Sequence, residues 1–236
     1  YGTYDESAPW YKYNNKIEKI TVNADVVSTT YFWDEKTEEE IPVTIYAMIF
    51  SSYPNLREVE LGDRFPSAKL QSFNNLFAGC TKLEVIDFGN IDTSNIITFK
   101  SMFYNCTSLK EVDLSKINTE NALDLGGMFM YCKSLQSIDL SGFETGNVTD
   151  MSCMFQGCHE LTDIDISSFD TSNLEQMVAM FESCKKIKSM DLSVFDLSNV
   201  ACCMRLFYGC DALETVALGE SMRNATGYFD AMFCAC

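Results

Sequence analysis

The stretch SGFETGNVTDMSCMFQGC, residues 141–158, is followed 26 positions later by SSFDTSNLEQMVAMFESC, residues 167–184, and then by SVFDLSNVACCMRLFYGC, residues 193–210. The same register extends along most of the chain, because one phenylalanine returns at every twenty-sixth position. This column comprises Phe77, Phe103, Phe129, Phe155, Phe181, Phe207 and Phe233. A fixed period of this length indicates a repeat protein, in which one small unit stacks on copies of itself.

Further columns keep the same period. A cysteine stands three positions after each phenylalanine, at Cys80, Cys106, Cys132, Cys158, Cys184, Cys210 and Cys236. An apolar residue follows three positions later, at Leu83, Leu109, Leu135, Leu161, Ile187 and Leu213. An asparagine recurs at Asn95, Asn121, Asn147, Asn173 and Asn199. Several columns in one register leave little room for chance.

Each copy is predicted to form a strand, a turn and a short helix. In the strand, Leu135, Ile138 and Leu140 should point inward and Asp139 outward, because side chains alternate along a strand. A stretch rich in Ser, Gly, Asp and Asn then favours a turn. After it, the apolar residues of 148–158 fall at helical spacing, and Asn147 stands where a helix N-cap would stand. Stacked units would bury their apolar faces and align the strands in a parallel ladder.

The first part of the chain departs from the repeat. Phe50, Leu56 and Leu61 fit an earlier copy with Tyr53 in the cysteine position, and its step of 27 to Phe77 predicts one inserted residue in RFPSAKL, residues 64–70. Residues 1–45 are therefore assigned to an N-terminal cap and residues 46–236 to an array of about seven units plus a partial one. Within the cap, KIEKITVN suggests a degenerate first repeat unit with Ile17 and Ile20 in the core. An acidic loop, DEKTEEE, residues 34–40, is expected after it.

Aromatic residues crowd the N-terminal cap at Tyr4, Trp10, Tyr11 and Tyr13. They favour a cover for the end of the core, which repeat arrays need, and a stacking platform for a sugar is the alternative. At the other end, the final strand around residues 213–218 should have an unpaired edge. Such edges invite pairing, so we expect either further chain or self-association through this edge.

Composition and charge narrow the classes of function. The 236 residues include 47% apolar residues, enough for a substantial core, and no stretch approaches the roughly 18 apolar residues of a membrane span. The net charge of −17 argues against nucleic acid and anionic membranes as partners. The chain shows no signal peptide and does not begin with Met, so its location cannot be read directly.

The eleven cysteines have two interpretations. The seven periodic ones favour a reduced, buried column over a ladder of disulfides, because neighbouring Cβ vectors run parallel in a stack. Cys203 occupies the position of Met151 and Met177 and is expected in the core. The remaining Cys153, Cys202 and Cys234 are candidates for exposed, reactive thiols.

The whole unit resembles the BspA-type leucine-rich repeats of bacterial cell-surface proteins. The motif FDTSNxxxMxxMFxxCxxLxxIDLSxF is carried by Phe143, Thr145, Asn147, Met151, Met154, Phe155, Cys158, Leu161, Ile164 and Asp165 and by their equivalents over about residues 46–236. SAPWYKYNNKIEKITV, residues 7–22, also resembles the segment that precedes such arrays. The position three after the last strand leucine holds Phe143, Phe169 or Phe195, so the asparagine ladder of ordinary leucine-rich repeats should not be assumed.

Together with this resemblance, the period predicts an α/β fold, a right-handed leucine-rich-repeat solenoid of 26-residue strand, turn and short-helix units with a parallel β-sheet on one face. The resemblance implies an extracellular, cell-surface protein of the adhesion or host-interaction kind without enzymatic activity. Extracellular or host surface proteins are then the expected partners.

The residues themselves also argue against catalysis. His159 is the sole histidine and is expected in a solvated turn, so one base at most could serve a catalytic triad. No glycine loop for phosphate is present, and we expect no cofactor. Cys202 with Cys203 and Cys234 with Cys236 have the wrong spacing for a zinc site.

An aspartate column is the most informative polar feature, at Asp87, Asp113, Asp139, Asp165 and Asp191. Neighbouring carboxylates about 4.8 Å apart would repel, so something must offset that repulsion. Hydrogen bonds to Ser115, Ser141, Ser167 and Ser193 and to turn backbone groups are one interpretation. The other is an acidic stripe on a concave face, widened by Glu111 and Asp163, that binds a cationic partner or Ca²⁺.

Three functions are compatible with the sequence. The first is a surface protein whose solenoid binds other proteins, since solenoids offer extended binding surfaces. The second is a structural spacer or display stalk. A carbohydrate-binding module, supported by the N-terminal aromatics alone, is the third. The position two before each aspartate varies (Val85, Glu111, Ser137, Asp163, Ser189, Thr215), as a binding face or a drifting solvated face would.

Overall fold

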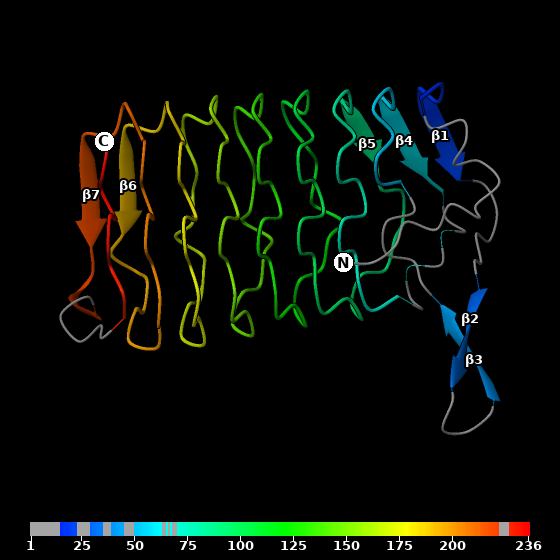
Figure 1. Cartoon of the computed structure of the whole chain (residues 1–236). Coiled ribbons are helices and arrows are strands. Elements are labelled where there is room, and N and C mark those ends of the chain that lie inside the picture. The colour runs from blue at the N-terminus through cyan, green and yellow to red at the C-terminus, as the bar shows by residue number, and fades with distance from the viewer. Residues whose placement is uncertain are drawn as a thin grey trace.

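The computed structural model describes residues 15–22, 29–34, 39–44, 50–62, 65, 67, 70–221 and 227–236. Its strands are β1 (Lys19–Val22), β2 (Thr29–Asp34), β3 (Glu39–Thr44), β4 (Glu58–Leu61), β5 (Val85–Asp87), β6 (Ser189–Leu192) and β7 (Thr215–Leu218). Successive turns of the chain, here called rungs, stack side by side into a solenoid (Figure 1). The aromatics expected to cap the core, Tyr4, Trp10, Tyr11 and Tyr13, lie outside the described residues.

Parallel strands line one side of the solenoid, as the sequence predicts. The strand order is β1-β4-β5 at one end and β6-β7 at the other, with parallel pairing throughout. The segments in line between β5 and β6 continue the same course, and their backbones bond from rung to rung, for example Gln136 N to Lys110 O at 3.0 Å. Leu135 and Leu140 are buried and Asp139 is exposed, which confirms the predicted alternation. The outward positions of these strands and segments form the strand face.

The opposite side contains no α-helix among the described residues, so the predicted short helix is wrong. Residues 150–158 instead form overlapping turns, in which Met154 N bonds to Met151 O and Cys158 N to Phe155 O. Alternate N–H groups bond to the next rung instead, and Phe155 N donates to Met180 O at 2.9 Å. These turns bury Met151, Met154, Phe155 and Cys158, which are spaced three or four residues apart, as on the buried face of a helix. The equivalent segment of every rung together forms the turn face.

Left-handed residues make this zigzag possible. Cys153 and Ala179 occupy the same position in consecutive rungs with φ of 59° and 55°. Such a conformation costs about 1–2 kcal/mol in a residue other than glycine. The hydrogen bonds that it aligns between rungs, such as Cys153 N to Val178 O at 2.8 Å, offset this cost.

Isolated parallel bridges join the rungs along the turn face at the 26-residue step, and they connect Ser72, Thr98, Asp124, Asp150, Gln176, Cys202 and Tyr228 in that order. Nearer the N-terminus, Glu60 pairs with Asp87, a step of 27. The extra residue therefore lies between Glu60 and Ser72, where the sequence predicted an insertion.

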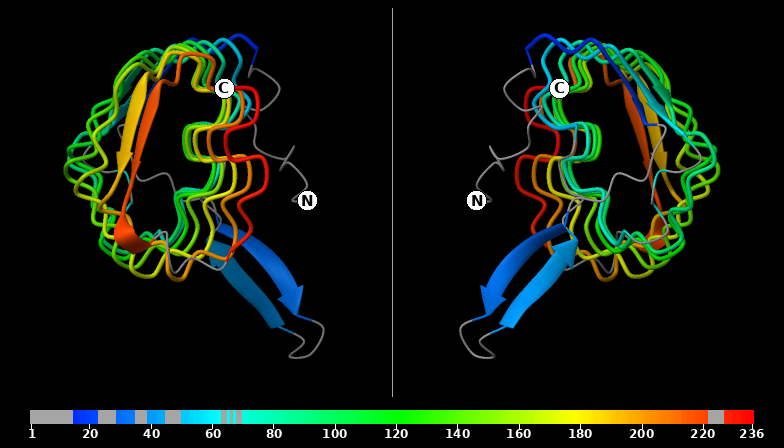
Figure 2. Two further views of the ribbon diagram at one scale, coloured as in Figure 1. Left: turned by 90° about the vertical axis from the view of Figure 1, so that its left-hand side faces the viewer. Right: turned by 90° about the vertical axis from the view of Figure 1, so that its right-hand side faces the viewer.

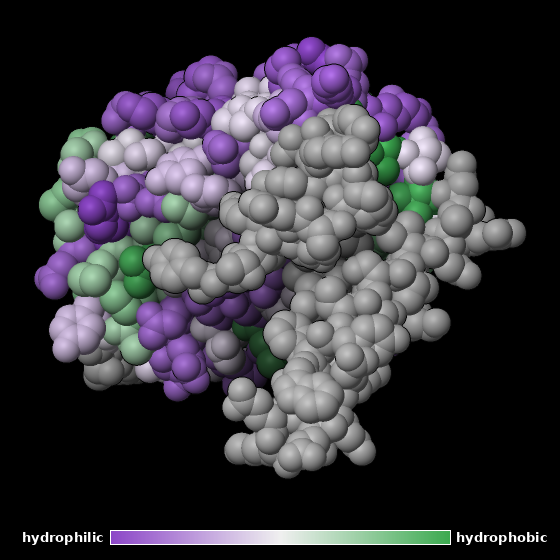
Figure 3. Space-filling model, turned by 45° about the vertical axis from the view of Figure 1, so that its right-hand side comes forward, coloured by the Kyte–Doolittle hydropathy of each residue, from purple (hydrophilic) through white to green (hydrophobic). Residues whose placement is uncertain are grey.

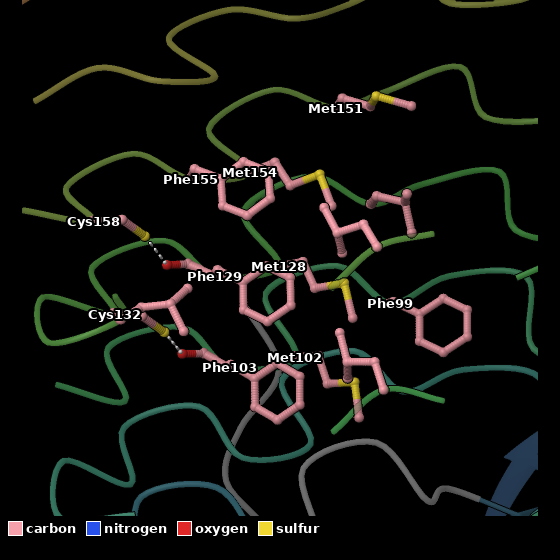
Figure 4. Packing of buried hydrophobic residues seen from close by; sticks show 14 of the residues in the cluster. Phe99, Met102, Phe103, Met128, Phe129, Cys132, Met151, Met154, Phe155 and Cys158 are labelled. Atoms are coloured by element: carbon pink, nitrogen blue, oxygen red, sulfur yellow. Dashed lines mark hydrogen bonds between the residues drawn. The ribbon is translucent and has the colours of Figure 1, made fainter. Parts of the chain in front are cut away.

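The core is a set of stacked columns (Figure 4). The rings of Phe129 and Phe155 lie 5.5 Å apart and within 6° of parallel, and the stack extends from Phe50 to Phe233. Beside it, Cys158 donates its thiol to the carbonyl oxygen of Phe129 at 3.2 Å. Each rung thus covers the apolar face of the one before it, as the sequence predicts.

The rungs follow one another in a nearly straight row (Figure 1), so the expected concave face is not present. Helices pack about 8–10 Å apart, whereas strands lie about 4.8 Å apart, and that mismatch bends a solenoid that has helices on one side. Here backbone hydrogen bonds join neighbouring rungs on both sides, so the distance between rungs is similar on the two sides. The strand face is consequently flat along the solenoid axis rather than cupped.

An antiparallel hairpin of β2 and β3 belongs to the first rung. It projects from one corner of the cross-section, with the strands on one side and the turn segments on the other (Figure 2). β1 precedes it and pairs Lys19 with Glu58 of β4, so the rung that contains the hairpin is longer than the others. Ile17 and Ile20 pack against the core, as expected for a degenerate first rung.

Candidate functional site: the strand face

The aspartate column stands at the ends of the strands, exposed along the strand face. In each rung the Oδ1 atom accepts the N–H of the residue two positions later. The pairs are Asp87 with Gly89 at 2.8 Å, Asp113 with Ser115, Asp139 with Ser141 and Asp165 with Ser167 at 2.9 Å, and Asp191 with Ser193 at 2.8 Å. This Asx-turn geometry starts the turn that follows the strand.

The same contacts offset the repulsion between neighbouring carboxylates. Hydrogen bonds from the side chain and backbone of Ser141 lower the pKa of Asp139, although the charges of Asp113 and Asp165 act in the opposite direction. The backbone and hydroxyl of Ser115 likewise lower the pKa of Asp113. The geometry therefore supports the turn-forming interpretation of this column, and each carboxylate also adds its charge to the face.

Glu111 and Asp163 lie on the same face, exposed, in the column next to the aspartates. Their position corresponds to Val85 of β5, which is 54% exposed, and to Ser189 of β6. Among the residues that the structure describes, no three His, Cys, Asp or Glu side chains are grouped as a metal site would require. Calcium binding by this column thus has no support beyond the row of carboxylates.

Two polar ladders tie the rungs together beside the strand face. The buried Thr119 donates its hydroxyl to Glu144 O at 3.0 Å and accepts the N–H of the same residue at 2.8 Å. Buried equivalents are Thr93, Thr145 and Thr171. The repeating threonine was visible in the sequence motif, but its hydrogen-bonding role was not foreseen.

The asparagine column forms the second ladder. Asn147 donates its amide to Glu120 O of the preceding rung at 2.9 Å, so the N-cap predicted for it is wrong because no helix follows. Asn121, Asn173 and Asn199 make the same contact. An asparagine ladder therefore exists here at a position different from that of ordinary leucine-rich repeats.

The turn face carries mixed charges. Arg205 forms a two-pronged ion pair with Glu182, at 3.0 and 2.6 Å, and lies 4.3 Å from the centre of the Tyr208 ring. Lys100 bridges Asp124 and Asp150 at 3.1 and 3.8 Å. These side chains pair with one another, so the turn face offers less uncompensated charge than the strand face.

The turns that precede the strands form a polar rim. Lys82, Lys133, Lys185 and Lys186 are exposed in them, and Figure 3 shows hydrophilic side chains along this upper edge. His159 lies half-buried in the same turns, and partial burial, followed by the charges of Lys133 and Lys185, lowers its pKa. It has the turn position that the sequence predicts.

All eleven cysteines are free thiols. Cys203 is buried, as predicted, and burial raises its pKa to about 12. Of the three candidates for reactive thiols, Cys234 is exposed, whereas Cys153 and Cys202 are half-buried. Burial, together with the charges of Glu182 and Asp150, raises the pKa of Cys153. Cys234 is therefore the candidate best placed to react.

No described helix has the length and apolar character needed to cross a bilayer. No curated protein matches the sequence. A leucine rich cell surface protein from Faecalibacterium prausnitzii A2-165 is similar in structure, with a TM-score of 0.44, 16% identity, and coverage of 93% of this chain and 73% of that one.

The T. pallidum Leucine Rich Repeat protein gives a TM-score of 0.39 at 19% identity, over 86% of this chain and 71% of that one. The sequence itself matches one protein family over residues 71–188 and 138–235, which together span well over half of the chain. The chain belongs to that family, described as "Mycoplasma protein of unknown function, DUF285".

Proposed function

We propose that this chain is a non-enzymatic cell-surface protein whose strand face binds other proteins. The observation that carries the proposal is that the two outward columns of that face differ in how much their residues vary. One outward column, the aspartates, has a fixed identity and a fixed hydrogen-bonding role in the turns. The adjacent outward column, which includes Val85, Glu111 and Asp163, is exposed and differs from rung to rung.

A flat face of this kind suits recognition of another protein surface. Variable side chains stand on a regular grid, and the backbone beneath them is held by rung-to-rung hydrogen bonds. Little conformational freedom is then lost on binding. The aspartates add negative charge along the face, which favours a partner with Lys and Arg side chains. The extracellular location rests on the resemblance of the repeat motif to BspA-type proteins.

Binding of the purified chain to a panel of extracellular-matrix proteins, epithelial surface proteins and glycans tests the proposal. Saturable binding to a protein, weakened by added salt, is the expected result. The variant Glu111→Lys with Asp163→Lys should reduce it, while the control Glu175→Lys, an exposed carboxylate directly before the turn face, should not. Equal effects of the two variants would place the interface elsewhere.

A second pair of variants separates the aspartates' structural role from a binding role. Replacing Asp139 and Asp165 with Asn keeps an oxygen for the turn hydrogen bonds and removes the charge. If the charges contact the partner, binding should weaken although the variant stays folded, whereas a fall in melting temperature with binding unchanged would assign the charges to the turns alone. Repeating the measurement with calcium and with EDTA tests the calcium interpretation directly.

The spacer and carbohydrate alternatives give different results in the same experiments. A display stalk would bind nothing on the panel through this face, and its straight, hydrogen-bonded rungs suit that role. A carbohydrate-binding module would bind glycans and would be insensitive to the Glu111→Lys and Asp163→Lys changes.

A further inference from the structure

The polar rim gathers cations in a chain that is strongly acidic as a whole. Four consecutive turns of this rim, residues 107–110, 133–136, 159–162 and 185–188, contain five lysines and one carboxylate, that of Glu160. All five lysines are exposed, namely Lys110, Lys133, Lys185, Lys186 and Lys188. The net charge of the chain is −17, so these four turns, here called the basic rim, differ in sign from the rest of the surface.

The repeat places these cations in a row along the solenoid axis. Lys133, His159 and Lys185 occupy the same position in three consecutive rungs, at steps of 26 residues. Backbone hydrogen bonds hold neighbouring turns together, and Gln136 N donates to Lys110 O at 3.0 Å. Because the rungs lie about 4.8 Å apart, the basic rim extends over about 14 Å. A linear ligand could therefore contact several lysines at once.

More than half of these lysines lack a compensating carboxylate. Lys185 forms an ion pair with Asp211 at 3.1 Å, and Lys186 forms one with Glu160. The other three ammonium groups form no ion pair with a residue that the structure describes, and they belong to Lys110, Lys133 and Lys188. These three charges are available to an anionic ligand.

His159 lies between two of the cations. Partial burial lowers its pKa, and the positive charges of Lys133 and Lys185 lower it further, whereas Glu160 and Asp211 act in the opposite direction. An anion held at the basic rim would offset the charges of the two lysines and so favour the protonated ring. The histidine would then add a positive charge to the site.

The remaining side chains of the basic rim narrow the class of ligand. The large apolar residues of the four turns are buried, at Leu109, Leu135, Leu161 and Ile187. A membrane anchor and the centre of a protein interface need exposed apolar groups, and single-stranded nucleic acid needs aromatic rings for stacking. Hydroxyl and amide groups stand between the lysines instead, at Thr107, Ser108, Ser134, Gln136 and Thr162. Cations mixed with such groups suit a ligand that carries both anionic groups and hydroxyl groups.

We propose that the basic rim binds an acidic polysaccharide, a sugar polymer with sulfate or carboxylate groups, that lies along the solenoid axis. Its anionic groups pair with the lysine ammonium groups, and its hydroxyl groups bond to polar side chains such as Gln136 and Thr162. Repulsion by the aspartate column is limited, because charges are screened over about 8 Å at physiological ionic strength. The rim and the strand face are separate surfaces, so the proposal is independent of the protein partner proposed above.

NMR of the full chain tests the proposal directly, because His159 is the sole histidine and its ring signals are unique. The probes are heparin, which carries sulfates and carboxylates, polygalacturonate, which carries carboxylates only, and uncharged dextran. Calorimetry should show saturable binding of an acidic polymer but not of dextran, and added salt should weaken it. The bound polymer should shift the His159 signals and raise the pKa of the ring. Binding of heparin alone would identify sulfate as the recognised group, and binding of both acidic polymers would identify carboxylate as sufficient.

Lysine variants locate the binding site. Lys133→Gln should weaken binding about two- to fivefold, and its combination with Lys185→Gln and Lys188→Gln about tenfold or more. Lys116→Gln is the matched control, because it removes an exposed lysine from a turn that follows a strand segment, and it should leave binding unchanged. The proposal is overturned if neither acidic polymer binds, if Lys133→Gln and Lys116→Gln have equal effects, or if binding leaves the signals and the pKa of His159 unchanged.

Discussion

The thiol of Cys132 lies 3.2 Å from the carbonyl oxygen of Phe103, the stacked ring residue of the preceding rung. The same relationship recurs along the column, at 2.8–3.2 Å. A thiol is small enough for a fully buried position and can donate a weak hydrogen bond. Cysteine therefore recurs because it fills the core and adds a weak second donor to a carbonyl that already accepts a backbone N–H, that of Cys106 in the case of Phe103.

Cys132→Ala should accordingly destabilise the chain by about 1–2 kcal/mol, mainly from lost packing and to a smaller extent from the lost thiol hydrogen bond. Urea unfolding measures the change in the free energy of unfolding. Cys234→Ala, at an exposed thiol, is the matched control and should change it by less than about 0.5 kcal/mol. Equal effects of the two substitutions would contradict a structural role for the column.

Thiol reactivity should follow burial. Burial raises the pKa of Cys132 to about 12, so almost no thiolate forms there near pH 8, and the reagent cannot reach it. Brief alkylation of the native protein followed by mass spectrometry should modify Cys234 and Cys236 first, because both are exposed, and Cys153 more slowly. The exposure of Cys236 departs from the buried position predicted for the periodic cysteines. Modification of Cys132 at a rate similar to Cys234 would show that the core opens readily.

The sequence predicts the columns well because burial follows directly from the period. Every rung must present the same residue to the same neighbour, so Phe155 and Cys158 could be placed in the core without knowing the backbone. Backbone conformation was harder to predict, because overlapping turns and a helix bury similar residues. The choice between them depends on the next rung, which accepts the N–H of Phe155 that a helix would bond internally.

The candidate site was predicted in part. Exposure of Asp139 followed from alternation, and its bond to Ser141 was one of two interpretations offered. The flatness of the face could not be foreseen, because it depends on the missing helix. Asn147 was misplaced for the same reason, since its amide reaches a carbonyl 27 residues earlier rather than starting a helix.

The threonine ladder should contribute strongly to stability. Thr119→Val keeps the shape of the side chain but removes an oxygen that serves both the N–H and the C=O of Glu144. Leaving these part-buried backbone groups without the hydroxyl should cost about 1–3 kcal/mol, measurable by urea unfolding. Thr162→Val, at an exposed threonine with a long 3.5 Å contact, should be nearly neutral. A small loss at Thr119 would mean that water replaces the hydroxyl.

The aspartate column should make stability depend on acid. Hydrogen bonds from serine lower the pKa of Asp113, Asp139 and Asp165 in the folded chain. Their stabilising contribution is therefore complete above the unfolded pKa, near 4, and is lost as pH falls through the lower folded value. Thermal unfolding from about pH 7 to about pH 2 should show this loss. Replacing all three with Asn should make the melting temperature depend less on pH. If the melting temperatures of the two proteins fall in parallel as the pH is lowered, the column is not the source of the acid dependence.

Gly89 and Gly142 differ in whether the local backbone requires a glycine. Gly89 follows β5 with φ of +57°, and a Cβ there would lie 2.2 Å from the carbonyl oxygen of Leu61 in the preceding rung. Gly89→Ala should therefore destabilise the chain by about 2 kcal/mol or more, since the obstructing atom belongs to backbone that rung-to-rung bonds hold in place. A Cβ at Gly142, in the turn of a later rung, would meet nothing within 4 Å. Gly142→Ala should be neutral or slightly stabilising in the same urea titration, because it restricts the unfolded chain. Similar values for both would mean that the rungs can separate around residue 89 at little cost, contrary to the close stacking that the phenylalanine column requires.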